Sequence, residues 1–202
     1  MSITSTEWAR KRGIPFLAVV AALLVPAAAS AAVETFQRFE AVATANFVVR
    51  EQCPDGSTVT KQVSVIGGHE EESESGATTL DSDFVTVLIR GFNCDGTFVN
   101  DRGSGPAEFT FSTSLQEANV TGTITTRDGR LVSIDVDWAG VGPIESSSNT
   151  TTFPGFTGHF QSKRRDAVAS GTVVVDGQTL VDGSTTNAEL ETLEDKNIST
   201  GT

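Results

Sequence analysis

The chain has no tyrosine, one methionine, two cysteines and two histidines among its 202 residues. A Ser-His-Asp triad would need His69 or His159 beside a reactive serine, and the G-x-S-x-G turn of such hydrolases is absent. Fourteen basic against 26 acidic residues give a net charge of −12, so no general basic field attracts nucleic acid. No motif specifies a chemistry, and we expect neither a catalytic residue nor a cofactor.

The N-terminus has the three zones of a signal peptide. Arg10, Lys11 and Arg12 precede an uncharged run over residues 14–29. Ala29-Ser30-Ala31 fits the small-residue cleavage pattern and Ser30-Ala31-Ala32 fits it nearly as well, so the cut falls after Ala31 or Ala32. The alternative is a retained membrane anchor, since residues 14–33 are just long enough to span a bilayer. Pro26 and the small residues favour cleavage. We therefore expect a signal peptide at 1–31, a single domain at 32–202, and a secreted or periplasmic protein without stable membrane insertion.

Asp-Gly pairs divide the remaining chain. They occur at 55–56, 95–96, 128–129, 176–177 and 182–183. Asp-Gly between alternating apolar segments is a strong hairpin signal, because a type I′ turn needs positive φ at both central residues. The pair at 128–129 has the clearest setting: apolar residues alternate with polar ones before it, from Val120 to Ile124, and after it, from Val132 to Trp138.

Threonine and valine dominate these segments, and no stretch shows a long helical period. The spacing of turn signals predicts an all-β fold of about nine or ten strands, either an antiparallel β-sandwich or a small β-barrel. The run from Phe84 to Ile89 is apolar at nearly every position and predicts a central strand buried on both faces. We expect polar loops at residues 69–82 and 140–158, and a last strand after Ala188.

Cys53 and Cys94 each end an apolar strand just before a glycine turn. In an exported domain, two such cysteines predict one structural disulfide. It would close a segment of 42 residues and stabilise the fold by roughly 4 kcal/mol in the chain-entropy model.

Candidate binding residues are sparse. Asp135 and Asp137 share one strand face, but the apolar residues alternating with them predict that both are solvated rather than catalytic. The acids of the 69–82 loop could gather around calcium, although no calcium-loop motif occurs, and we predict no metal site. Phe153, Phe156, His159 and Phe160 flank a Pro-Gly turn and form a possible ligand or contact loop.

Two stretches and the turns Cys53-Pro54-Asp55-Gly56 and Cys94-Asp95-Gly96 carry a resemblance. Trp138-Ala139-Gly140-Val141-Gly142-Pro143, together with His159-Phe160 through Ala169-Ser170-Gly171-Thr172-Val173, resembles a loose set of exported all-β bacterial proteins of unknown function. The resemblance implies export and an all-β fold, and carries no catalytic residues. We expect a non-enzymatic protein that binds an envelope or extracellular component, or is structural there. The alternatives are a barrel holding a small apolar ligand and, more weakly, a hydrolase using acidic residues.

Overall fold

Ten β-strands make up most of the chain that the structure, a computed structural model, describes: residues 33–200. The predicted signal peptide lies outside this range. Residues 33–200 contain no helix that is long and apolar enough to span a membrane. The strands are β1 (Val33–Gln52), β2 (Thr58–Glu74), β3 (Ala77–Phe92), β4 (Phe98–Pro106), β5 (Glu108–Phe111), β6 (Glu117–Thr125), β7 (Leu131–Gly140), β8 (Glu145–Phe153), β9 (Phe156–Val175) and β10 (Gln178–Thr200).

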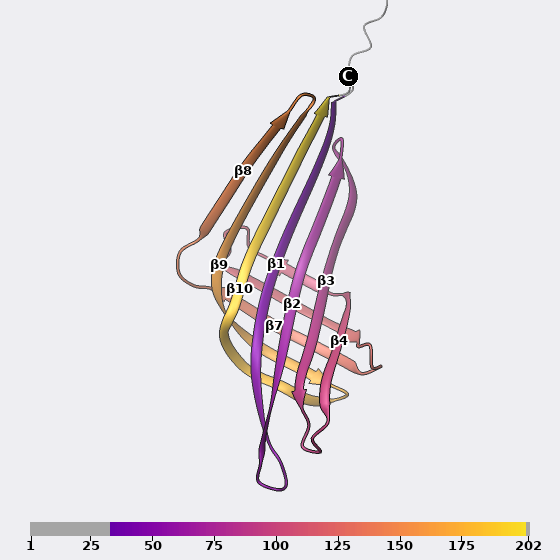
Figure 1. Cartoon of the computed structure of the whole chain (residues 1–202), viewed down its shortest axis with the longest axis vertical. Coiled ribbons are helices and arrows are strands. Elements are labelled where there is room, and N and C mark those ends of the chain that lie inside the picture. The colour runs from indigo at the N-terminus through magenta and orange to yellow at the C-terminus, as the bar shows by residue number, and fades with distance from the viewer. Residues whose placement is uncertain (1–32, 201–202) are drawn as a thin grey trace, which may run out of the picture. The chain divides into compact units, whose positions relative to one another are not determined.

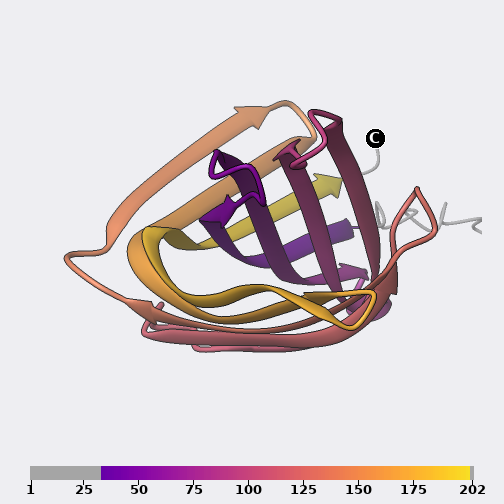
Figure 2. The same cartoon turned by 90° about the horizontal axis from the view of Figure 1, so that it is seen from below.

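All pairings are antiparallel, in the order β4-β3-β2-β1-β10-β9-β7-β6-β5, with β8 paired to β9 beside this path. The first half of β9 pairs with β8 and the second half with β7, while β10 accompanies it throughout. The long hairpin of β9 and β10 therefore belongs to both layers and connects one to the other. Figure 1 shows β1–β4 running lengthwise with β7 crossing behind them, and Figure 2 shows the two layers face to face.

The bend lies where β10 leaves β1. Their pairing ends at Ala45 and Ala188, and the β9–β10 register shifts between Thr185 and Ala188. Side chains replace the interrupted ladder: Trp138 Nε1 donates to the Thr44 carbonyl at 2.8 Å, and Thr185 Oγ1 donates to the Asn46 carbonyl at 2.8 Å. Buried backbone acceptors need such partners, so these two bonds join the layers at their corner.

The predicted all-β fold is confirmed, and of its two forms the structure is the sandwich-like one. Strands β4 and β5 end the sheet path and do not pair with each other, so over residues 33–200 the sheet is not closed into a barrel.

Alternation along the strands builds the core. On β7 the residues Val132, Ile134, Val136 and Trp138 are buried, and the residues between them are exposed. The facing layer contributes Val63, Val65, Val85, Val87 and Ile89. β-Branched side chains suit this pleated, half-buried surface. The prediction that Trp138 is in the core while Asp135 and Asp137 face outward is confirmed.

Four of the five Asp-Gly pairs form turns, of more than one kind, and the fifth, at 182–183, lies inside β10, where it pairs with β9. Asp176 and Gly177 both have positive φ (50° and 82°), as a type I′ turn requires. Gly56, Gly96 and Gly129 have positive φ near 80°, whereas the aspartates before them do not. At 128–129 the Gly129 N–H bonds to the Thr126 carbonyl and the Thr126 N–H to the Arg130 carbonyl. The predicted hairpin at 128–129 is therefore present, but its predicted two-residue turn geometry is wrong.

The loop predicted at residues 69–82 is wrong, because β2 and β3 run through it. They pair from Lys61 with Gly91 to Glu74 with Ala77, and Ser75-Gly76 forms the turn with both φ positive. The loop predicted at 140–158 is also largely wrong, because β8 occupies 145–153 and Gly155 makes a turn into β9. Both segments are polar, and their sequences lack the alternation that marks a strand, yet each pairs with a neighbouring strand through backbone hydrogen bonds. The predicted last strand after Ala188 is confirmed as part of β10.

The segment Phe84–Ile89 lies in β3, between β2 and β4, as predicted for a central strand. The prediction that this strand is buried on both faces is wrong. Val85, Val87 and Ile89 point into the core, whereas Phe84, Thr86 and Leu88 are only half-buried. We call the side of β1–β4 that carries Thr86 and Leu88 the outer face, because it points away from the core.

Candidate functional site

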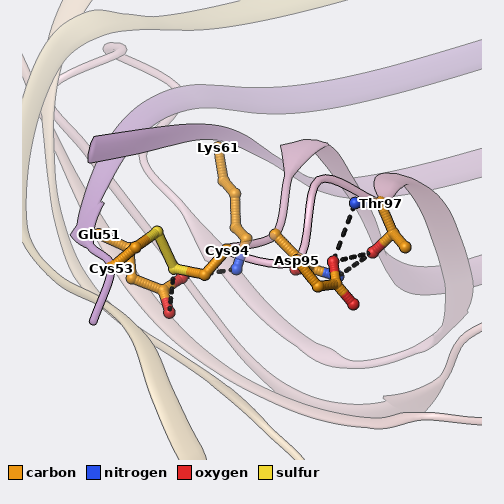
Figure 3. Close-up of polar contacts among 7 residues, drawn as sticks. Glu51, Cys53, Lys61, Cys94, Asp95 and Thr97 are labelled. Atoms are coloured by element: carbon orange, nitrogen blue, oxygen red, sulfur yellow. Dashed lines mark hydrogen bonds and ion pairs between the residues drawn. A yellow bond between two sulfur atoms is a disulfide. The ribbon is translucent and has the colours of Figure 1, made fainter. Parts of the chain in front are cut away.

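The predicted disulfide is present. Cys53 and Cys94 are bonded, with their Cα atoms 5.4 Å apart. The bond joins the β1–β2 turn to the β3–β4 turn, so it ties together one end of the four-strand layer (Figure 3). Beside it, Lys61 Nζ contacts Glu51 Oε2 at 2.8 Å.

The two glycine turns at this end are closed in the same way. Asp95 accepts hydrogen bonds from the Thr97 hydroxyl at 2.6 Å and the Thr97 N–H at 2.9 Å (Figure 3). Asp55 makes the equivalent bonds to Ser57. In both turns the hydroxyl bond, followed by the backbone bond, lowers the pKa of the aspartate. These aspartates have a structural role in the turns.

The predicted contact residues Phe153, Phe156, His159 and Phe160 lie on the β8–β9 hairpin. The phenylalanine side chains are 62%, 37% and 43% exposed, and the Phe153 and Phe156 rings stack with centroids 6.5 Å apart. His159 Nδ1 lies 3.0 Å from Thr150 Oγ1 on the neighbouring strand. The β8–β9 register places the three phenylalanines on one face of the hairpin and His159 on the other. The structure therefore brings the aromatic residues together and separates the histidine from them.

The other polar residues considered from sequence are dispersed. His69 lies on β2 and its Nδ1 is 2.8 Å from Asp83 Oδ1 on β3, in a half-buried pair. Asp135 and Asp137 both approach the amide of Asn119, at 3.5 and 2.9 Å. Within residues 33–200 there is no group of three or more His, Cys, Asp or Glu side chains placed to hold a metal ion.

A groove that sequence reasoning missed lies on the outer face of β1–β4. Its volume is about 530 Å³, within the range usual for ligand sites. The register places its residues in rows across the strands. One row holds Thr44, Ile66 and Thr86, the next Asn46, Ser64, Leu88 and Arg102, and the third Arg90 and Asn100.

Three arginines line this groove: Arg90 on β3, Arg102 on β4 and Arg127 from the β6–β7 turn. We call it the arginine groove. Its lining contains no aspartate or glutamate. Among the residues with described positions, neither Arg90 nor Arg102 has a carboxylate within 4 Å, and Arg127 has only Asp128 at 3.8 Å. Arg90 Nε instead donates to Asn100 Oδ1 at 3.1 Å. The groove is therefore positive within a strongly acidic chain.

A buried carboxylate positions the third arginine. Asp101 on β4 is 0% exposed. It accepts hydrogen bonds from Thr126 Oγ1 at 2.6 Å and from the Asp128 N–H at 3.3 Å, which dock the β6–β7 turn against β4. In the docked turn, the Arg127 N–H donates to the Arg102 carbonyl and its guanidinium to the Asn100 carbonyl. Asp101 thus holds Arg127 over the edge of the sheet and into the groove.

The remaining lining is hydrogen-bonding and apolar. Ser64 Oγ donates to Asn46 Oδ1 at 2.6 Å, and Thr86 Oγ1 donates to Ser104 Oγ at 2.8 Å. Ile66 and Leu88 are half-buried between these polar side chains and supply apolar surface. The sequence contained one signal for the site, arginines in an acidic chain. However, the strand register brings Arg90 and Arg102 together, and only the docking of the β6–β7 turn adds Arg127.

Comparisons with known proteins add little. No protein-family model and no curated protein matches the chain. A solved structure that it resembles is that of a provisionally named AttH protein of Nitrosomonas europaea. The likeness covers 84% of this chain and 52% of that one, with 11% identity and a TM-score of 0.22. The chain spans about half the length of the AttH protein, and a likeness of this size supports no conclusion about fold or function.

Proposed function

We propose that the chain is an exported, non-enzymatic binding protein whose arginine groove holds an anionic, hydroxyl-rich ligand. An acidic polysaccharide of the envelope or extracellular space has this chemistry. One observation carries the proposal: three arginines and no acidic residue line a groove in a chain of net charge −12. Clefts lined by one sign of charge concentrate ligands of the opposite sign.

The side chains in the groove match such a ligand. A guanidinium presents its donors in a fork that fits carboxylate or sulfate oxygens. Arg90 and Arg102 are diagonal neighbours on adjacent strands, and such neighbours lie about 7–8 Å apart. They can therefore contact successive charged groups of an extended ligand. The hydroxyl and amide groups of Thr86, Ser64 and Asn46 can exchange hydrogen bonds with sugar hydroxyls.

The composition of the groove favours binding over catalysis. Arginine, amide, hydroxyl and apolar side chains orient a ligand, but none of them exchanges protons readily near neutral pH. The runner-up function, a barrel around an apolar ligand, required a closed sheet, and the sheet over residues 33–200 is open.

Export has separate support. The basic residues 10–12 and the uncharged run at 14–29 have the pattern of a signal peptide. The Cys53–Cys94 disulfide is compatible with an oxidising compartment outside the cytoplasm. Mass spectrometry of the mature protein should find its N-terminus at Ala32 or Val33. An intact Met1 in the soluble extracellular fraction would contradict export.

The binding proposal is tested with a matched pair of probes. Isothermal titration should show binding of an oligogalacturonate and none of its methyl ester, which has the same backbone without charge. Affinity should fall as salt is raised, because the contacts are electrostatic. Dextran sulfate against neutral dextran separates sulfate from carboxylate recognition. Equal binding of charged and uncharged probes, or no binding of either anion, would refute the proposal.

A further inference from the structure

Among the described strands, β4, β5 and β8 each pair along one side only. The free side of such a strand presents unpaired backbone N–H and C=O groups, which another strand can bind. Native proteins usually cover or shorten these edges. Residues 77–83 of β3 also lack a strand partner on the side where the rest of β3 pairs with β4, but they include Asp81 and Asp83, and charged side chains oppose edge pairing. The edges of β4, β5 and β8 differ sharply in how they are protected.

Two of the edges are protected. Along β4, the Arg127 N–H and guanidinium occupy the carbonyls of Arg102 and Asn100, so the β6–β7 turn covers part of the strand. Strand β5 has four residues and offers little backbone to a partner. The parts of β1 and β10 that separate at the bend are bridged by Trp138 and Thr185.

Strand β8 has no such protection. It is nine residues long, each of them is exposed, and its only backbone partner in the described structure is β9. Its sequence, Glu-Ser-Ser-Ser-Asn-Thr-Thr-Thr-Phe, contains no proline, lysine or arginine, and its pairing with β9 has no bulge. Proline, lysine and bulges are the devices that normally prevent edge pairing.

An apolar patch accompanies the free edge. Phe153 at the end of β8 and Phe156 and Phe160 on β9 are exposed on one face of the same hairpin. Exposed aromatic residues beside a sheet edge are typical of a protein contact surface.

We infer that β8 pairs antiparallel with β8 of a second copy of this chain, joining two sheets edge to edge around a two-fold axis. The bonds formed are backbone N–H to C=O bonds between the two β8 strands. Because the axis is perpendicular to the sheet, the phenylalanine patches of both copies lie on the same side of the joined sheet.

A second copy suits this edge better than an unrelated strand. Residues 146–152 are all serine, threonine or asparagine, so they make equivalent contacts when read in the opposite direction. Two copies of an acidic chain repel each other, but β8 has one charged residue, Glu145, and that lies opposite Arg164 on β9. The copies therefore meet where their charge repulsion is small.

Sedimentation equilibrium of the mature protein over a wide range of concentration tests the inference. We expect a monomer–dimer equilibrium, and Asn149→Lys should raise the dissociation constant at least tenfold, since a lysine on an edge strand opposes pairing with another strand. Ser133→Lys, on the exposed face of the interior strand β7, adds the same charge away from the edge and should leave the equilibrium unchanged.

Single cysteines placed in turn at residues 147–151 locate the contact. Cross-linking between copies should peak at one of these positions and fall on both sides, with Ser133→Cys as the background control. A monomer at every concentration, or cross-linking no higher than the control, would overturn the inference. A monomer that floats with phosphatidylcholine vesicles, and stops doing so after Phe153→Ser, would assign the hairpin to a lipid surface instead.

Discussion

The outer face of β1–β4 has two ends with opposite electrostatics. Near the β2–β3 turn, the guanidinium of Arg38 contacts three carboxylates, those of Glu40, Glu70 and Glu72, at 3.5, 2.5 and 3.8 Å. At the disulfide end, Arg90 and Arg102 have no described carboxylate within 4 Å.

This difference shows why net charge alone describes the molecule poorly. Arg38 is neutralised by its own chain, so it has little attraction left for an external anion. In the arginine groove the counter-charges are missing, and a bound anion would supply them. Because salt screens exposed charges over about 8–10 Å, the acidic end of the face does not cancel the field of the groove.

Removing the disulfide should have the largest effect, and mainly at the groove end. Cys53→Ala with Cys94→Ala should lower the free energy of unfolding by about 4 kcal/mol, because the closed segment is long. Urea unfolding measures the loss. Hydrogen exchange should rise more in the β3–β4 turn than in the β2–β3 turn. A uniform rise over both ends would show that the bond does not act locally.

Removing the buried carboxylate should come next. Asp101→Ala leaves Thr126 Oγ1 and the Asp128 N–H without their acceptor and should cost about 2–3 kcal/mol. Denaturant unfolding is the measurement, with Asp135→Ala, an exposed acid on β7, as the control expected within about 0.5 kcal/mol. Anion binding should also weaken, because Arg127 loses its support. Equal stability of the two variants would show that Asp101 does not hold the β6–β7 turn in place.

Neutralising one arginine at each end of the outer face compares the contributions of the two ends to anion binding. Arg102→Gln should weaken binding of oligogalacturonate at least tenfold, which is about 1.4 kcal/mol. Arg38→Gln should leave the affinity unchanged, because Arg38 is already paired with glutamates. Isothermal titration gives both values. If the two variants lost affinity equally, binding would depend on total charge and not on the groove.

The smallest effect is expected for the acidic end. Glu70→Gln and Glu72→Gln should each change the free energy of unfolding by less than about 0.5 kcal/mol, because partly exposed ion pairs contribute little. Denaturant unfolding at low salt measures this. A loss of several kcal/mol would mean that the Arg38 cluster is needed to form the β2–β3 hairpin.

The sequence predicted those parts of the fold that depend on local pattern. Alternation identified the β6–β7 hairpin and the inward position of Trp138, and the placement of Cys53 and Cys94 before glycine turns identified their disulfide. Alternation failed where both faces of a strand are polar. The largely acidic segment 69–74 and the Ser/Thr/Asn segment 146–152 therefore looked like loops, although pairing with β1, β3 and β9 holds them as strands.

Local sequence pattern could not predict the candidate site, for a different reason. Arg90, Arg102 and Arg127 are neighbours only because the register sets Arg90 opposite Asn100 and because Asp101 docks a turn from another layer. An acid at an inward position of β4 resembles any other polar residue in sequence. Its partner, Thr126, follows 25 residues later and gives no sign of the contact.

The most direct test of anion recognition at the groove is to map the bound ligand on the protein. In two-dimensional ¹H–¹⁵N NMR spectra of the mature chain, oligogalacturonate should shift the amide signals of Ile66, Leu88, Arg90 and Arg102 in a saturable way. The amides of Glu70 and Glu72 at the acidic end, and those of β8, should not move, and the methyl ester should shift none of these signals. Shifts centred on the acidic end or on β8, or equal shifts with the uncharged ester, would contradict the assignment of the ligand site to the arginine groove.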